Sequence, residues 1–175
     1  MDLILEDIQR ALRAGASYAA LAAAVTLPEI CGRCEQQDMY SRKGKNSGDK
    51  VFNRFVDKYL HNWDIGLTGA DLYSLRNGLS HRGQLTERRN THRYVFFPPN
   101  TGSVVHNNLS FQGGELVRVQ IDLQKFCDDI SEAVKKWQVD QAENELVQKN
   151  LEDVLQAREG DFGTGIFIQG VHYLA

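Results

Sequence analysis

The sequence predicts a mainly helical bundle with a small antiparallel β insertion. Apolar residues recur with helical spacing up to about residue 83 and again after residue 121, whereas the stretch between them is rich in β-branched and aromatic residues and turn signals. The chain has 175 residues, of which 42% are hydrophobic and 25% charged, as in ordinary globular proteins. We therefore expect a single domain over residues 1–175, with residues 84–121 as the β-rich insertion.

The first part of the chain predicts two helices and a short third one. The first has an apolar stripe and breaks near Gly15. The alanine-rich stretch after Gly15 has small side chains, which would let other helices approach closely. Pro28 suits the first turn of a new short helix, which we expect to run to about Gln37. The stripe of the first helix consists of Leu5, Ile8 and Leu12.

The middle of the chain contains the clearest helical pattern. Residues 41–50 contain no apolar side chain and predict a basic loop. The apolar positions from Val51 to Trp63 then form one wide buried face. Thr68 and Asp71 have the spacing of a capping box, so we expect the next helix to begin there.

After Gly83 the pattern changes to three short β-rich pieces, which we expect to pair as a small antiparallel sheet. Asp122 can cap a helix whose apolar stripe runs to Trp137. A last helix is predicted at residues 141–158, followed by an edge strand at residues 165–168. The three pieces are residues 94–97, 103–106 and 116–121.

Three residues of the helix that starts at Thr68 can perform phosphodiester chemistry together. Asn77 and His81 are four residues apart and share a helix face, and Arg76 can reach the same patch. A histidine can transfer protons near neutral pH, and an arginine fork matches two phosphate oxygens. RNA carries its own 2′-hydroxyl nucleophile, so its cleavage needs a base, an acid and charge stabilisation. Because one histidine supplies only one proton transfer, we expect a homodimer to supply the second.

The same run also fits a structural role. Leu72, Leu75 and Leu79 form an ordinary buried stripe, and a histidine near a helix C-terminus is favoured by the helix dipole. Gly78 costs about 1 kcal/mol in a helix compared with alanine, which indicates a close approach of another backbone, such as that of a second copy. On residue chemistry alone the structural reading is favoured, because short motifs often occur by chance.

The run Arg76-Asn77-Gly78-Leu79-Ser80-His81 resembles the motif of the HEPN superfamily, in which an arginine, a polar residue, three spacers and a histidine lie on one helix. This family comprises small helical domains, many of them metal-independent ribonucleases of toxin, defence and RNA-processing systems. The resemblance implies an HEPN-like bundle, a dimer cleft, and Arg76, Asn77 and His81 as catalytic residues. The resemblance also allows a noncatalytic role, because the family includes members that bind without cutting.

The charge distribution favours an anionic ligand near the motif. The net charge is −3, which excludes a generally basic nucleic-acid binder. Residues 76–93 nevertheless carry a net charge of +4, whereas residues 122–161 carry −6. We expect the basic segment to contact RNA. Its candidate RNA-binding residues, besides the motif arginine, are Arg82, Arg88, Arg89 and Arg93.

The remaining reactive residues give weaker signals. The sequence around Cys31 and Cys34 shows no further zinc ligands, so we favour two reduced core cysteines over a redox or metal site. Either His92 or His106 could face the motif helix and supply a second proton carrier within one chain. Signatures of P-loops, serine hydrolases and zinc proteases are missing, and we expect no cofactor or metal.

Together with the HEPN resemblance, these observations predict a cytoplasmic homodimer that binds RNA and cleaves it as a metal-independent endoribonuclease. The resemblance alone implies a toxin or defence system. The alternative is a noncatalytic HEPN-like module that binds a nucleotide, RNA or a partner protein such as an antitoxin. A third possibility is an interaction protein whose motif helix only stabilises a dimer. We expect no membrane segment, because no apolar run is long enough to span a bilayer, and the acidic start lacks the features of a secretory signal.

Overall fold

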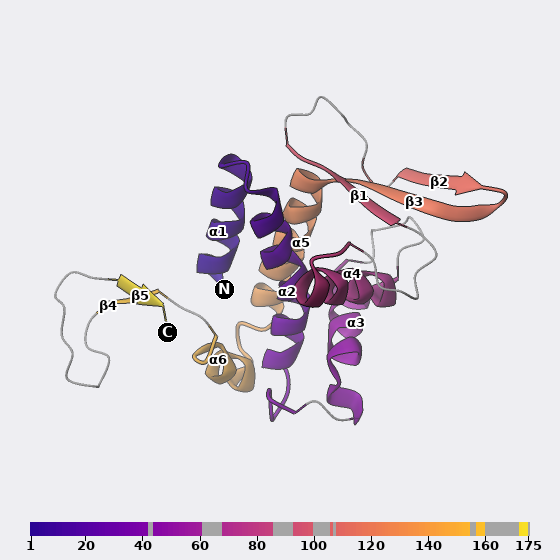
Figure 1. The fold of residues 1–175 in the computed structure, drawn as a ribbon. Helices are drawn as coiled ribbons and strands as arrows, with labels where there is room; N and C mark the ends of the chain where they lie inside the picture. The colour runs from indigo at the N-terminus through magenta and orange to yellow at the C-terminus, as the bar shows by residue number, and fades with distance from the viewer. Residues whose placement is uncertain are drawn as a thin grey trace.

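The structure is a computed structural model of the chain, and Figure 1 shows its helices gathered around a long central one. It describes residues 1–41, 44–60, 68–85, 93–99, 106, 108–154, 157–159 and 172–174. Within these residues the fold is mainly helical with a small three-stranded sheet, as the sequence predicts. The helices are α1 (Asp2–Arg13), α2 (Ser17–Cys34), α3 (Gly48–Tyr59), α4 (Gly69–Arg82), α5 (Leu123–Asp140) and α6 (Glu145–Leu151), with a short 3-10 turn η1 (Gly44–Asn46) before α3.

Helix α2 is the hub of the bundle, since it contacts each of the other five helices described above. Its first half is rich in alanine, and small side chains let neighbouring helices approach closely. This confirms the prediction made for that stretch. The chain turns between α1 and α2 at Gly15, whose φ of 72° lies in the left-handed region, also where a break was expected.

The prediction that Pro28 begins a new helix is wrong, because α2 runs without interruption from Ser17 to Cys34. A proline inside a helix lacks an N–H for the usual hydrogen bond and crowds the carbonyl one turn earlier. Packing outweighs this local cost here, since Leu27 and Cys31, on either side of Pro28, are fully buried. The helix also ends at Cys34 rather than near Gln37.

The C-terminal end of α2 is fixed by α6. The side-chain amide of Asn150 donates to the carbonyl oxygens of Cys34 and Gln36, each at 2.9 Å. Carbonyls at the end of a helix have no partner within it, so these two bonds satisfy groups that would otherwise be buried alone. Asn150 thereby links the last described helix to the hub of the bundle.

The sheet is mixed rather than antiparallel. Its strands are β1 (Arg93–Phe97), β2 (Asn108–Gln112) and β3 (Glu115–Asp122), in the order β1-β3-β2. β2 and β3 form an antiparallel hairpin, whereas β1 runs parallel to β3. The prediction was wrong for β1 because neighbouring strands along the chain need not be neighbours in the sheet. In Figure 1 the β2–β3 hairpin extends away from the helices.

Four further expectations differ from the structure or lie outside the described residues. The predicted strand at residues 103–106 lies outside the described residues except for His106, which is not in a strand. The last helix ends at Leu151 rather than at residue 158, and residues 157–159 form β4, which pairs antiparallel with β5 (His172–Leu174). The predicted edge strand at 165–168 lies outside the described residues. The helix expected to reach Trp63 instead ends at Tyr59, with Leu60 as its C-cap.

Helix α4 begins as the sequence predicts. The Thr68 hydroxyl accepts a hydrogen bond from the backbone N–H of Asp71, and the Asp71 carboxylate accepts one from the backbone N–H of Thr68, which completes the capping box. The helix ends at Gly83, where a φ of 62° places the backbone in the left-handed region. This fixes both ends of the helix that carries the motif.

We expect Thr68→Ala to lower the free energy of unfolding by about 1 kcal/mol, because the first turn of α4 loses its side-chain cap. Urea denaturation followed by circular dichroism would measure this loss. Thr68→Ser keeps the hydroxyl and should remain close to the wild type. Equal losses in both variants would mean that the threonine methyl group, not the cap, matters.

The hydrophobic core lies between the helices and continues under the sheet. Leu75 of α4, Phe126 of α5 and Val119 of β3 all belong to one buried cluster. Asp122 caps α5 by accepting from the backbone N–H of Lys125, as predicted. None of the helices in the described part of the chain is both long enough and apolar enough to cross a membrane.

Candidate functional site

The three motif residues line one cleft beside α4. This cleft has a volume of about 640 Å³, and its walls come from α2, the start of α3, and α4. The motif therefore lies at a concave surface, where a ligand could be held on several sides. The lining residues are Glu29, Arg33, Gly48, Tyr73, Arg76, Asn77, His81 and Arg82.

Arg76 is the central cation of the cleft, with a side chain that is 21% exposed. Its Nη1 donates to Oδ1 of Asn77 at 2.9 Å, and its guanidinium carbon lies 6.0 Å from the ring centre of Tyr73. The amide of Asn77 thus holds one side of the guanidinium. Its Nη2 lies 2.8 Å from Oε2 of Glu29, which makes an ion pair.

Glu29 and Arg33 belong to the cleft, although sequence reasoning missed both. Arg33 donates from Nε and Nη2 to the same carboxylate oxygen of Glu29, Oε1, at 3.2 and 3.0 Å. The Glu29 carboxylate therefore lies between two guanidinium groups, and its side chain is only 14% exposed. The one sequence signal was their spacing of four residues on a helix, which is common in surface ion pairs as well.

Arg33 also anchors the segment that leads to α3. Its Nη1 lies within hydrogen-bonding distance of three backbone carbonyl oxygens, of which that of Ser41 is nearest at 2.6 Å. The other two belong to Met39 and Asn46. The basic loop expected at residues 41–50 is thus fixed in part by Arg33, and from Gly48 onward it is already helix α3.

Gly48 forms a wall of the cleft where a side chain would force its neighbours to shift. A Cβ atom at this position would lie 2.7 Å from the Tyr73 hydroxyl and 2.9 Å from Oε1 of Glu29. Both distances are shorter than real carbon contacts allow, so the glycine lets α3 begin directly against the carboxylate. The first turn of α3 thereby adds partial positive charge close to Glu29.

His81 and Arg82 lie in the last turn of α4, at the exposed rim of the cleft. His81 is the only histidine that lines the cleft among the residues that the structure describes. Among the described residues His106 does not line this cleft; its Nε2 lies 3.3 Å from Oδ2 of Asp129 on α5. The other proposed proton carrier, His92, lies outside the described residues.

The structure places the predicted RNA-binding arginines unevenly. Arg82 lines the cleft, and Arg93 is the first residue of β1. Arg88 and Arg89 lie outside the described residues. Two arginines of the motif helix and Arg33 of α2 are therefore the described guanidinium groups at the site.

Gly78 is buried within a single chain, in the second half of α4. Its carbonyl accepts a hydrogen bond from the backbone N–H of Gln84 at the end of the helix. Any residue could accept this bond, and the burial lies within one chain, so Gly78 gives no evidence for a second copy. The expected homodimer must be argued from the chemistry of the site instead.

The three cysteines are buried free thiols. Desolvation by burial raises the pKa of the Cys34 thiol to about 11 and that of the Cys127 thiol to about 12. Burial also raises the pKa of Cys31, with the neighbouring Cys34 as a second cause. Thiols with raised pKa values stay protonated at neutral pH, which fits the predicted core role of Cys31 and Cys34.

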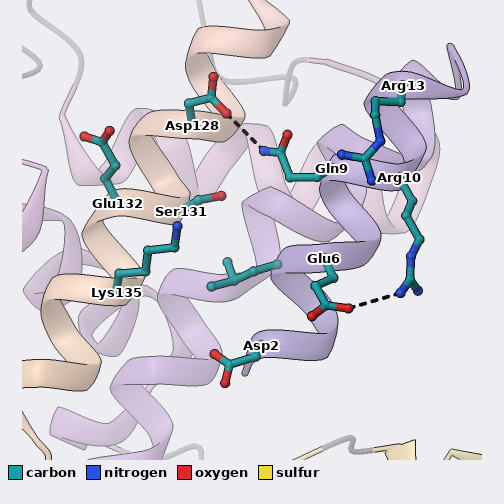
Figure 2. A pocket seen from close by; sticks show the side chains of 10 residues that line it. Asp2, Glu6, Gln9, Arg10, Arg13, Asp128, Ser131, Glu132 and Lys135 are labelled. Carbon is teal, nitrogen blue, oxygen red and sulfur yellow. Dashed lines mark hydrogen bonds and ion pairs between the residues drawn. The ribbon is translucent and has the colours of Figure 1, made fainter.

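A second concave surface lies between α1 and α5, away from the motif, with a volume of about 740 Å³ (Figure 2). Gln9 of α1 donates to Asp128 of α5 at 3.0 Å across it, and Glu6 pairs with Arg10 along α1. Its walls carry four acidic side chains against three basic ones, of which two are arginines. It therefore lacks the concentration of guanidinium groups that marks the cleft at α4.

Comparisons of the chain with protein-family models, curated proteins and solved structures found no match. The resemblance to the HEPN superfamily therefore rests on the residues of the motif.

Proposed function

We propose that this protein is an HEPN-like RNA-binding protein that cleaves RNA without a metal ion, with the cleft at α4 as its active site. One observation carries the proposal: Arg76, Asn77 and His81 line the same cleft together with two further arginines, Arg33 and Arg82. Guanidinium groups suit phosphate oxygens, and the histidine suits proton transfer at neutral pH.

In the proposed reaction the 2′-oxygen of the RNA attacks the adjacent phosphorus, and the bond from phosphorus to the 5′-oxygen breaks. One group removes the proton from the 2′-hydroxyl, and another protonates the leaving 5′-oxygen. His81 performs one of these two transfers. Arg76, held by Asn77, balances the charge that develops on the phosphate oxygens. The products are a 2′,3′-cyclic phosphate and a 5′-hydroxyl.

A homodimer supplies the second proton carrier in this proposal. The exposed position of His81 at the rim of the cleft would allow a second copy of the chain to place its own His81 opposite the same phosphate. A cytoplasmic toxin or defence role, with an antitoxin-type partner, follows from the HEPN resemblance alone.

The experiment that tests the function is incubation of wild-type and His81→Ala protein with mixed-sequence RNA in EDTA. We expect the wild type to produce cyclic-phosphate ends and the variant to lose cleavage by at least about a hundredfold, the contribution typical of general acid or base catalysis. Gel electrophoresis and mass spectrometry of the ends measure this. Because His81 is exposed, the variant should fold normally, which circular dichroism checks. Equal cleavage by both proteins would refute the catalytic role.

The second candidate is a noncatalytic module that binds RNA, a nucleotide or a protein partner. It is favoured by the ion pair that already engages the Arg76 guanidinium with the buried carboxylate of Glu29. RNA binding without turnover, unchanged in His81→Ala, would select this candidate over the enzyme.

A further inference from the structure

The carboxylate of Glu29 occupies the part of the cleft that is best suited to a phosphate. It lies between the guanidinium groups of Arg33 and Arg76 and against the first turn of α3 at Gly48. A phosphate group at the Arg76 side of this place would meet the guanidinium that now faces Oε2 of Glu29. The free protein thus already holds an anion at this place, and that anion is its own side chain.

The two arginines hold this carboxylate unequally. Arg33 makes two hydrogen bonds to Oε1, and three backbone carbonyls hold its third nitrogen in place. Arg76 lies 2.8 Å from Oε2, but that oxygen accepts no hydrogen bond in this geometry, and Nε of Arg76 is buried without a hydrogen-bond partner. The pair between Arg76 and Glu29 is therefore the weaker one, and Arg76 keeps unused donor capacity.

We propose that Glu29 is an internal competitor for the phosphodiester, and that RNA binds by replacing the Glu29 carboxylate on Arg76 while Arg33 retains it. This inference rests on the proposed RNA-binding function and adds that the RNA must displace a side chain of the protein before it can bind Arg76. With His81 neutral, the ionised side chains of the cleft are three arginines and one glutamate, a net charge of +2 that still favours an incoming anion.

Competition of this kind lowers the apparent affinity for RNA. The ligand binds only those molecules in which Arg76 is released from Glu29. Its apparent association constant is therefore the intrinsic constant multiplied by the fraction of such molecules. Glu29→Gln removes the competing charge and keeps the size of the side chain. If Arg76 is released in about one wild-type molecule in ten, the variant binds RNA about tenfold more tightly.

The test measures binding of a 2′-O-methyl RNA oligonucleotide, which cannot be cleaved, by fluorescence anisotropy at low salt. Glu29→Gln is compared with Glu6→Gln, a matched control that breaks another glutamate–arginine pair of the same spacing and the same 3.0 Å length. We expect about tenfold tighter binding for Glu29→Gln and no change for Glu6→Gln. Unchanged or weaker binding by Glu29→Gln, with the wild type binding well, overturns the competition. Absence of binding by every protein overturns the proposed function itself.

A second measurement covers the case in which Glu29→Gln folds poorly, because it leaves two mostly buried guanidinium groups without their carboxylate. Inorganic phosphate should then replace the lost anion and raise the melting temperature of Glu29→Gln more than that of the wild type or Glu6→Gln. An equal rise in all three proteins would contradict the exchange at Arg76.

Discussion

Replacing Arg76 with alanine is expected to reduce RNA cleavage by about 100- to 1,000-fold, the loss typical of removing one preorganised donor for transition-state charge. Asn77 and Glu29 hold this guanidinium in position from two sides. We therefore expect no neighbouring side chain to replace it. The measurement is the initial rate of cyclic-phosphate formation in EDTA, with saturating RNA to separate catalysis from binding.

Arg76→Lys is the matched variant for this prediction. A lysine keeps the positive charge beside Glu29 but lacks the planar fork that engages two phosphate oxygens. We expect it to fold as the wild type does and to recover only a small part of the activity. Full activity of Arg76→Lys would show that the cleft needs a charge at this position and not the guanidinium geometry. Full activity of Arg76→Ala would remove the cleft from the mechanism.

The local features of the fold could be predicted from the sequence. The capping box of Thr68 and Asp71 and the cap of α5 at Asp122 depend on residues within one turn of each other. The same holds for the break at Gly15, where the backbone adopts a conformation that favours glycine. In each case the structure is decided by residues that are close together in the sequence, so the local sequence pattern is enough to predict it.

The predictions that failed depend on contacts between distant residues. Pro28 is a local signal for a helix start, but the packing of Leu27 and Cys31 against other helices keeps α2 continuous. The parallel pairing of β1 with β3 depends on the path of the chain between them, which strand patterns do not encode.

The candidate site shows the same division. Arg76, Asn77 and His81 could be grouped because they lie on one helix. Glu29 and Arg33 could not, because they lie on α2 and reach the cleft only through the packing of α2 against α4. The sequence suggests that the Arg76 guanidinium is free to bind an anion. In the structure it already forms an ion pair with the Glu29 carboxylate.

The largest effect on stability is expected from Trp137→Ala. Trp137 of α5 is completely buried, and its indole N–H donates to Oε1 of Glu35 at the end of α2 over 2.7 Å. Among the residues that the structure describes, this is the largest fully buried side chain. Its truncation leaves a cavity between the two helices, which costs about 3–5 kcal/mol. Chemical denaturation followed by circular dichroism measures the loss.

Trp137→Phe separates packing from the hydrogen bond. Phenylalanine fills much of the indole volume but cannot donate to Glu35, whose carboxylate is partly buried and loses that partner. We expect a loss of about 1–3 kcal/mol, smaller than for alanine. If packing alone mattered, Trp137→Phe would be close to the wild type; if the hydrogen bond dominated, both variants would lose similar stability. Glu29 and Arg33 also lie on α2, but Trp137 does not line their cleft. We therefore expect the Trp137 variants to weaken the proposed RNA binding only by lowering the fraction of folded protein.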